Sequence, residues 1–206
     1  MENKRLSQKP GSSRQKKVAV INDMTGFGRC ALAVALPVIS KLKVQCCPVP
    51  TAILSNHTAY PSCYFDDYTE HMEAYIGEWK KLDLTFDGIG TGFLGSRRQI
   101  AIVKEFIQNF CREDTIVMVD PIMGDNGKAY ATYTKDMCAE MKLLAACGDI
   151  VTPNVTEGCI LADMPYHEGT WKEGELLFMA ERIAETGPGK VVITGIPQGS
   201  YIGNFC

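Results

Sequence analysis

Several features that mark other classes of protein are missing from this 206-residue sequence. No apolar run is long enough to cross a bilayer, so nothing indicates a membrane protein. There are 21 basic and 24 acidic side chains, and the net charge of −3 gives no electrostatic basis for binding nucleic acid. No Gly-x-x-x-x-Gly-Lys-Ser/Thr sequence is present, which excludes a Walker-type nucleotide site.

The cysteines do not form a recognisable framework either. There are nine of them, an odd number, scattered through apolar segments without any Cys-x-x-Cys pair. This pattern is typical of reduced, buried thiols in a cytoplasmic protein, and it favours neither a disulfide framework nor a zinc site.

The N-terminal segment is polar and basic and lacks the apolar stretch of a signal peptide. It cannot bury enough apolar surface to become ordered, so we predict a disordered tail over residues 1–16. The remaining residues, 17–206, are enough for one domain with a sizeable core.

Strand-like and helix-like segments alternate along this domain. The predicted strands are 17–21, 44–50, 86–92, 115–121, 149–153 and 190–196. The predicted helices are 28–42, 66–82, 96–110, 134–146, 154–162 and 174–186. Such alternation predicts an α/β fold with a mostly parallel sheet that is covered on both faces. The last residues, 199–206, predict a turn followed by a strand without a partner.

Polar residues and glycines follow the strands at the points where they end. In a parallel sheet these ends share one edge, where open α/β folds bind their ligands. The sequence therefore predicts a small-molecule site at that edge. The residues concerned are Asn22, Asp23, Ser55, Asn56, His57, Thr58, Thr91, Gly92, Phe93, Asp120, Asp125, Lys128, Asn154, Glu157, Thr194 and Gly195.

Each of these residues also has an ordinary structural interpretation. Asn154 and Glu157, three apart at a strand end, fit a helix capping box. Asp23 fits a helix N-cap, and His57 fits a turn residue packed on the core. Asp-Asn-Gly at 125–127 is a favourable turn sequence. Asp120 is harder to explain structurally, because a carboxylate at the end of a buried strand is costly unless it is paired or bound to a metal.

One motif points to a different cofactor. The segment 26–31, Gly-Phe-Gly-Arg-Cys-Ala, fits the Gly-x-Gly-x-x-Ala fingerprint of dinucleotide-binding proteins. The residues Asn-Asp-Met-Thr separate it from the predicted strand end, and no acidic residue ends the second strand to hold a ribose. We therefore disfavour a nicotinamide or flavin enzyme.

Six segments resemble the pyridoxal kinases, the vitamin B6 kinases of the ribokinase-like superfamily, in order and spacing. They are INDMTGFGRCAL (21–32), SNHTAY (55–60), GTGFLGS (90–96), VDPIMGDNGKAY (119–130), GDIVTPNVTE (148–157) and KVVITG (190–195). The resemblance extends from residue 17 to about residue 203. Hydroxymethylpyrimidine kinases are the relatives most easily confused with this group.

The resemblance implies a three-layer α/β/α fold and ATP-dependent phosphorylation of the 5′-hydroxymethyl group of pyridoxal, pyridoxamine or pyridoxine. The expected cofactors are ATP and Mg²⁺, with a monovalent cation as a further expectation, and the expected assembly is a homodimer. Position by position, the resemblance assigns substrate binding to Asp23, His57, Thr58 and Phe93. It assigns ATP binding to Asp120, Asp125, Thr152, Asn154 and Thr194, and the metal to Asp120 and Glu157.

The sequence departs from this family at one point. Members carry their catalytic base in a Gly-x-Gly-Asp motif beyond the strand that corresponds to 190–196. Here Gly88-Ile89-Gly90 lies on an earlier strand and is followed by threonine. The resemblance thus implies a kinase domain without its C-terminal elements and leaves the catalytic residue unassigned. The alternatives are a catalytically dead, truncated binder of vitamin B6 or nucleotide, and a hydroxymethylpyrimidine-type kinase.

Overall fold

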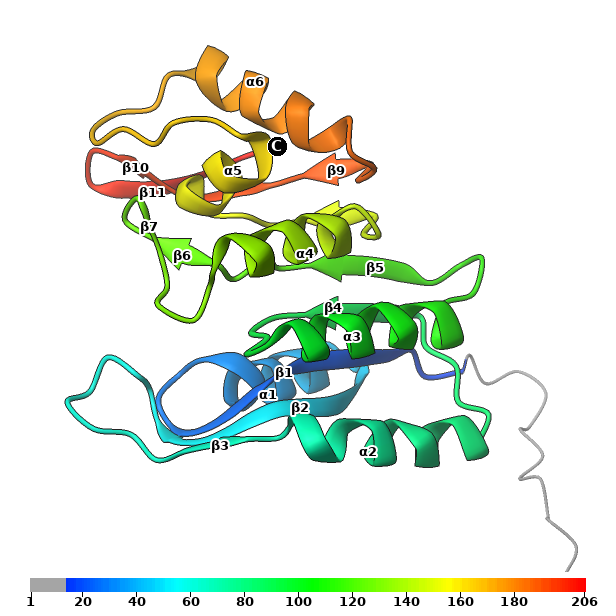
Figure 1. Ribbon diagram of the computed structural model, residues 1–206. Coiled ribbons are helices and arrows are strands. Elements are labelled where there is room, and N and C mark those ends of the chain that lie inside the picture. The colour runs from blue at the N-terminus through cyan, green and yellow to red at the C-terminus, as the bar shows by residue number, and fades with distance from the viewer. Residues whose placement is uncertain (1–13) are drawn as a thin grey trace, which may run out of the picture.

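The computed structural model describes residues 14–206, and a mostly parallel sheet forms its centre (Figure 1). In spatial order its strands are β3 (Phe65–Asp67), β2 (Gln45–Asn56), β1 (Lys17–Phe27), β4 (Gly88–Thr91), β5 (Ile116–Val119), β8 (Ile150–Val151) and β9 (Lys190–Val191). All neighbours are parallel except β2 and β3. The prediction of a mostly parallel α/β sheet is confirmed.

Helices cover the sheet, and two small antiparallel sheets complete the fold. The helices are α1 (Ala31–Lys41), α2 (Thr69–Lys81), α3 (Arg97–Phe110), α4 (Lys135–Ala145), α5 (Val155–Ala162) and α6 (Glu173–Ala184). In Figure 1, α1 lies behind the sheet, whereas α2, α3 and α4 lie in front of it. The small sheets pair β6 (Gly124–Asp125) with β7 (Lys128–Ala129), and β10 (Ile193–Gln198) with β11 (Tyr201–Phe205).

The first two strands are longer than the sequence predicts. They continue side by side as far as Phe27 and Asn56 and form an arm, residues 23–27 and 51–56, beyond the predicted strand ends (Figure 1). Pro48 and Pro50 do not end β2, because β3 joins it only from Ala52 onward. At both prolines β2 is therefore an edge strand, where a missing N–H costs no ladder hydrogen bond.

The end of the described chain also differs from the prediction. Residues 201–205 do not form an unpaired strand, because β11 pairs antiparallel with β10. Gly199, with a φ of +61°, lies in the short turn between them and permits the reversal. Ile193 and Ile196 of β10 are buried, whereas Tyr201 and Ile202 are each 78% exposed.

Residues 1–13 of the predicted tail lie outside the described residues. Arg14 and Lys16, which the prediction also placed in the tail, form ion pairs with Asp87 at 2.7 and 2.9 Å. The Lys16 hydrogen bond is the main cause that lowers the pKa of the Asp87 carboxyl.

All nine cysteines are free, as the sequence predicts. The expectation that they are buried is wrong for most of them, since only Cys159 is buried and Cys147 and Cys206 are exposed. No helix within residues 14–206 has the length and apolar character needed to cross a membrane.

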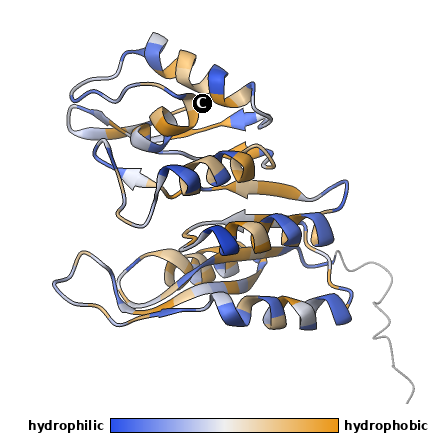
Figure 2. Ribbon diagram, viewed as in Figure 1, coloured by the Kyte–Doolittle hydropathy of each residue, from blue (hydrophilic) through white to orange (hydrophobic). Residues whose placement is uncertain are grey.

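The core contains a cluster of aromatic rings beneath α2 and α3. Phe106 lies 4.5 Å from Phe110 and 6.0 Å from Phe86, measured between ring centroids, and Trp79 of α2 completes the cluster. Figure 2 shows apolar and polar residues interspersed along α3, and the apolar ones, among them Ile100, Val103 and Phe106, are buried. Ser96 caps this helix by accepting the Gln99 N–H, as predicted.

Replacing Phe106, which is 1% exposed, by alanine should lower the free energy of unfolding by about 3–5 kcal/mol. The loss combines buried apolar area with a cavity that the neighbouring rings cannot fill. The control is Phe178→Ala on α6, where the side chain is 51% exposed, and its cost should stay below about 1 kcal/mol. Urea unfolding of both variants measures the difference, and equal losses would contradict the assigned core.

Candidate functional site

The carboxyl ends of the central strands bring the predicted polar residues to one edge of the sheet. Thr91 ends β4, Asp120 follows β5, and Asn154 follows β8. A parallel bridge links Asn154 to Thr194 at the start of β10. The sequence-based expectation that these strand ends share an edge is thus met by the backbone topology.

Asn154 and Glu157 form the capping box that the sequence predicts at the start of α5. The Asn154 side chain accepts the Glu157 N–H at 2.9 Å, and the Glu157 carboxylate accepts the Asn154 N–H at 2.8 Å. Both side chains also reach beyond the cap. Asn154 Nδ2 donates to the Gly124 carbonyl at 2.8 Å, and Glu157 Oε1 accepts the Met123 N–H at 3.1 Å. The cap therefore also fixes the segment that follows β5.

Asp120 and Glu157 are carboxylates in a poorly solvated place. Burial raises the pKa of the Asp120 carboxyl to about 6. Burial also raises the pKa of Glu157 to about 7, against the lowering effect of its hydrogen bonds to Asn154 and Met123, and the Asp120 charge adds to the rise. Two acids that resist ionisation next to each other form a site that attracts a cation.

Asp125 lies in the hairpin formed by β6 and β7, and its carboxylate is exposed. Asn126 and Gly127 form the turn with φ values of 50° and 74°, which is the conformation that Asn-Gly favours. The Gly127 N–H donates to the Thr156 hydroxyl at 2.9 Å, which ties the hairpin to α5. The predicted turn is confirmed, and it places Asp125 beside the helix N-terminus.

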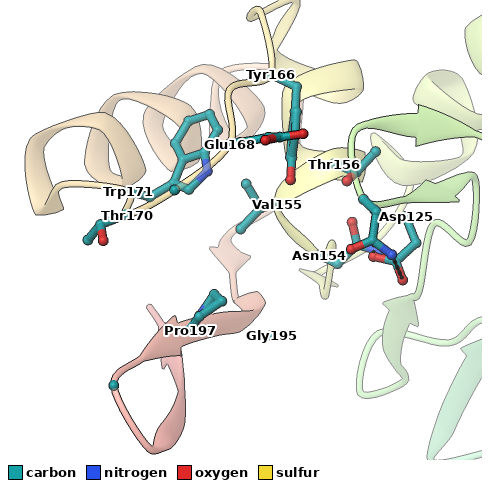
Figure 3. Close-up of a pocket in the computed structure, with 13 residues that line it drawn as sticks. Asp125, Asn154, Val155, Thr156, Tyr166, Glu168, Thr170, Trp171, Gly195 and Pro197 are labelled. Carbon is teal, nitrogen blue, oxygen red and sulfur yellow. Dashed lines mark hydrogen bonds between the residues drawn. The ribbon is translucent and has the colours of Figure 1, made fainter.

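A pocket of about 570 Å³ opens next to this hairpin (Figure 3). Asp125, Asn154 and Thr156 lie on one side of it, and Trp171 lies on the other. Sequence reasoning missed Thr156, Tyr166 and Trp171. The two aromatic rings come from the loop between α5 and α6, where the sequence has no helix or strand periodicity that would indicate which way a side chain points.

The two threonines predicted on the nucleotide side do not line this pocket. The Thr152 N–H donates to the Val119 carbonyl at 3.1 Å, and the Thr194 N–H donates to the Pro153 carbonyl at 2.8 Å. Both residues thus continue the sheet contacts beyond β8 and β9. Gly195, directly after Thr194, does line the pocket, together with Pro197 and Gly199 further along the same segment.

On the other half of the edge, Asp23 is buried and accepts the Thr25 hydroxyl at 2.6 Å. The Asn22 amide oxygen accepts the N–H groups of Asp23 and Phe93, at 2.9 and 2.8 Å. Asp23 therefore does not cap α1, which begins after Cys30. The structure brings it within one shared hydrogen-bond network with Phe93.

His57 and Thr58 lie at the tip of the arm, at some distance from Asp23. The strand register places Phe27, four residues beyond Asp23, beside Asn56. His57 lines a hollow of about 410 Å³ with Gly28, Arg29 and other residues that follow the two strands of the arm. Its Nδ1 accepts the Ala59 N–H at 3.1 Å, which is a turn contact and leaves Nε2 to donate, but His57 is exposed and is not packed on the core as the turn interpretation expected. Thr58 is exposed.

The oxygen donors at this edge fit Mg²⁺ only if water and phosphate oxygens complete its coordination. Within residues 14–206 there is no group of three or more His, Cys, Asp or Glu side chains that could hold a metal ion. Asp120 and Glu157 supply hard oxygen donors, and Mg²⁺ prefers one or two carboxylates together with water and phosphate oxygens. The site fits a metal that arrives with a phosphate ligand.

The fold, the polar sheet edge and its desolvated carboxylates define an α/β protein with a candidate small-molecule site at the carboxyl ends of its strands. The chain belongs to the phosphomethylpyrimidine kinase family, whose sequence profile matches residues 34–202. A crystallised phosphomethylpyrimidine kinase-type protein from Bacteroides thetaiotaomicron, solved with pyridoxal, is 43% identical with a TM-score of 0.86. The match covers 91% of this chain and 65% of that one.

Pyridoxal kinases are similar to this chain as well. The crystal structure of the Lactobacillus plantarum enzyme is 26% identical with a TM-score of 0.83, and the match covers 93% of this chain and 68% of that one. The pyridoxine/pyridoxal/pyridoxamine kinase of Bordetella pertussis is 27% identical over 154 residues, or 72% of this chain. The chain spans only 54% of that relative's length.

Replacing Asp120 by asparagine should stabilise the protein at high pH. With a pKa raised from 3.8 to about 6, the folded state favours the protonated acid, so the contribution of Asp120 to stability is greatest below pH 4 and is lost as the pH rises through 6. Asp120→Asn removes this loss, which is about 3 kcal/mol at most.

Urea unfolding at pH 4.5 and pH 8 measures this effect. The gap, which is the free energy of unfolding of the variant minus that of the wild type, should be larger at pH 8 than at pH 4.5. Asp114→Asn, which removes an exposed carboxylate before β5, is the control and should show no such gap. A gap of the same size at both pH values would contradict the burial of the Asp120 charge.

Proposed function

We propose that this chain binds a vitamin B6 vitamer and the phosphates of ATP at the carboxyl edge of its sheet, for transfer of a phosphoryl group to the vitamin's 5′-hydroxymethyl group. The observation that carries the proposal is the pair of poorly solvated carboxylates, Asp120 and Glu157, at the sheet edge that also holds Asp23, Phe93 and the pocket beside the β6–β7 hairpin. The 43% identical relative crystallised with pyridoxal supports the choice of vitamin.

The nucleotide side is proposed to be the pocket beside the β6–β7 hairpin. Its volume of about 570 Å³ is in the range of small-molecule sites, and it opens beside Asn154 and Asp125. Mg²⁺, when bound, would neutralise charge on the transferring phosphoryl group. Asp120 and Glu157 would hold it, and the capping box keeps Glu157 in place for that task.

The vitamin side is proposed to lie around Asp23 and Phe93, with the arm as its outer wall. Asp23 is positioned to bind a polar substituent of the pyridine ring, and Phe93 to pack against the ring. His57 and Thr58 would contact the vitamin only if the arm closes over it, since the register separates them from Asp23 in this structure.

The sequence contains no Gly-x-Gly-Asp, so we assign the proton acceptor to none of its residues. Phosphoryl transfer depends mostly on positioning and charge neutralisation, which this edge provides. Binding and turnover are therefore separate questions for the 206-residue chain. Calorimetric titration with pyridoxal and with Mg·ADP tests the binding, and formation of pyridoxal 5′-phosphate from ATP tests the turnover.

A second candidate substrate is a hydroxymethylpyrimidine, which the description of the matching family favours. It shares an aromatic nitrogen ring and a hydroxymethyl group with pyridoxal, so the same pocket could accept either. Parallel titrations with pyridoxal and 4-amino-5-hydroxymethyl-2-methylpyrimidine decide between them. Tighter binding of the pyrimidine would overturn the vitamin B6 assignment and leave the kinase-type site intact.

Asp23→Ala should weaken pyridoxal binding by about tenfold or more, because a hydrogen bond from the ligand to a charged group is lost. Asp23→Asn, which keeps the size and one acceptor oxygen, should lose less. Mg·ADP binding, which this proposal places at a different part of the edge, should change by less than twofold in both variants. Equal losses for both ligands would contradict the division into two regions.

A further inference from the structure

The backbone of Phe93 is held on both sides by side chains from neighbouring strands. Its N–H donates to the Asn22 amide oxygen at 2.8 Å, and its carbonyl accepts the Thr51 hydroxyl at 2.8 Å. Asn22 lies on β1, and Thr51, which is fully buried, lies on β2. Side chains thus satisfy both main-chain groups of this loop residue, which fixes its position outside any regular element.

Gly92 makes this arrangement possible. A β-carbon at Gly92 would lie 2.3 Å from the Asn22 amide nitrogen and 2.6 Å from its oxygen, which is far inside van der Waals contact. Any other residue would push the Asn22 amide away from the Phe93 N–H. The Gly92 N–H itself donates to the Ile21 carbonyl at 2.8 Å, so the loop continues directly from the ladder between β1 and β4.

A fully buried glutamine joins the same network from the other side. Gln99 Oε1 accepts the Gly95 N–H at 2.7 Å, and Nε2 donates to the Thr51 carbonyl and to the Thr69 hydroxyl, each at 2.8 Å. Gln99 therefore connects the loop after β4 to β2 and to the first turn of α2. A fully buried amide with its oxygen and both of its hydrogens in use holds its partners rigidly.

The network connects the two residues that the proposed vitamin site needs. The Asn22 amide oxygen also accepts the Asp23 N–H at 2.9 Å, so one atom sets the positions of Asp23 and Phe93 relative to each other. Binding sites gain affinity when their contacting groups are locked before the ligand arrives.

From this geometry we infer that Asn22 and Thr51 are positioning residues for the vitamin pocket: they clamp the Phe93 backbone and so set the affinity for the pyridine ring, without contacting the nucleotide. The inference rests on the proposed function, since it concerns the same pocket. It assigns to Thr51 and Asn22 a role in ligand affinity that acts through Phe93 and not through direct contact.

The test compares two variants of Thr51 in the 206-residue protein. Thr51→Val keeps the branched shape but removes the hydroxyl that holds the Phe93 carbonyl, and pyridoxal binding should weaken about 3- to 10-fold. Thr51→Ser keeps the hydroxyl but loses a buried methyl group. It should have a lower Tm than the wild type and yet bind pyridoxal within twofold of it. A purely structural role of Thr51 predicts that binding follows Tm in both variants.

Thr115→Val is the matched control. Thr115 is also buried, and its hydroxyl donates to the Phe86 carbonyl at 2.8 Å, but it precedes β5 at the opposite edge of the sheet. This variant should lose stability and keep its affinity for pyridoxal. Mg·ADP binding should be unchanged in all three variants.

The outcomes separate this inference from the function on which it rests. If the wild type binds pyridoxal and Thr51→Val binds it equally well, or Thr51→Ser binds as weakly as Thr51→Val, the clamp is overturned and the proposed function stands. If the wild type does not bind pyridoxal, both are overturned.

Discussion

The carboxylate of Glu157 connects chain segments that are far apart in the sequence, and the proposed nucleotide side of the site depends on it. Its two oxygens accept the N–H groups of Asn154, at the start of α5, and of Met123, beyond the end of β5. The β6–β7 hairpin and the pocket beside it follow from these two contacts. Because Glu157 is 3% exposed and lies near Asp120, the same acid that organises the backbone also makes the edge receptive to a cation.

The two halves of the edge are organised by different chemistry. Near Asp120 and Glu157, burial keeps negative charge poorly solvated, which costs stability and is typical of sites whose charge is neutralised by a ligand. Near Asp23 and Phe93, neutral amides and hydroxyls hold the backbone. The side chains of Asn22, Thr51 and Gln99 form hydrogen bonds with the main chain of Asp23, Phe93 and Thr51 respectively. A metal-phosphate ligand suits the first arrangement, and a small aromatic ring suits the second.

The regular core of the fold could be predicted from the sequence, because it depends on local patterns. The Ser96 cap, the capping box at Asn154 and the Asn-Gly turn all have signatures within four residues, and each is confirmed. The arm and the β10–β11 pairing depend on contacts between strands, so local pattern gave the wrong strand ends there. The structural role of Gln99 could not be predicted for a similar reason. It lies in an apolar helix stripe, and its hydrogen-bond partners are 30 and 48 residues away in the sequence.

The proposed function requires one sheet edge to bind the vitamin and the nucleotide phosphates next to each other. A crystal structure of this chain soaked with pyridoxal and Mg·ADP would show both ligands at once. We expect the pyridine ring against Phe93 and Asp23, and phosphates with Mg²⁺ between Asp120, Asn154 and Glu157. A ring bound in the pocket lined by Tyr166 and Trp171, or phosphates away from the Asp120 edge, would contradict this placement.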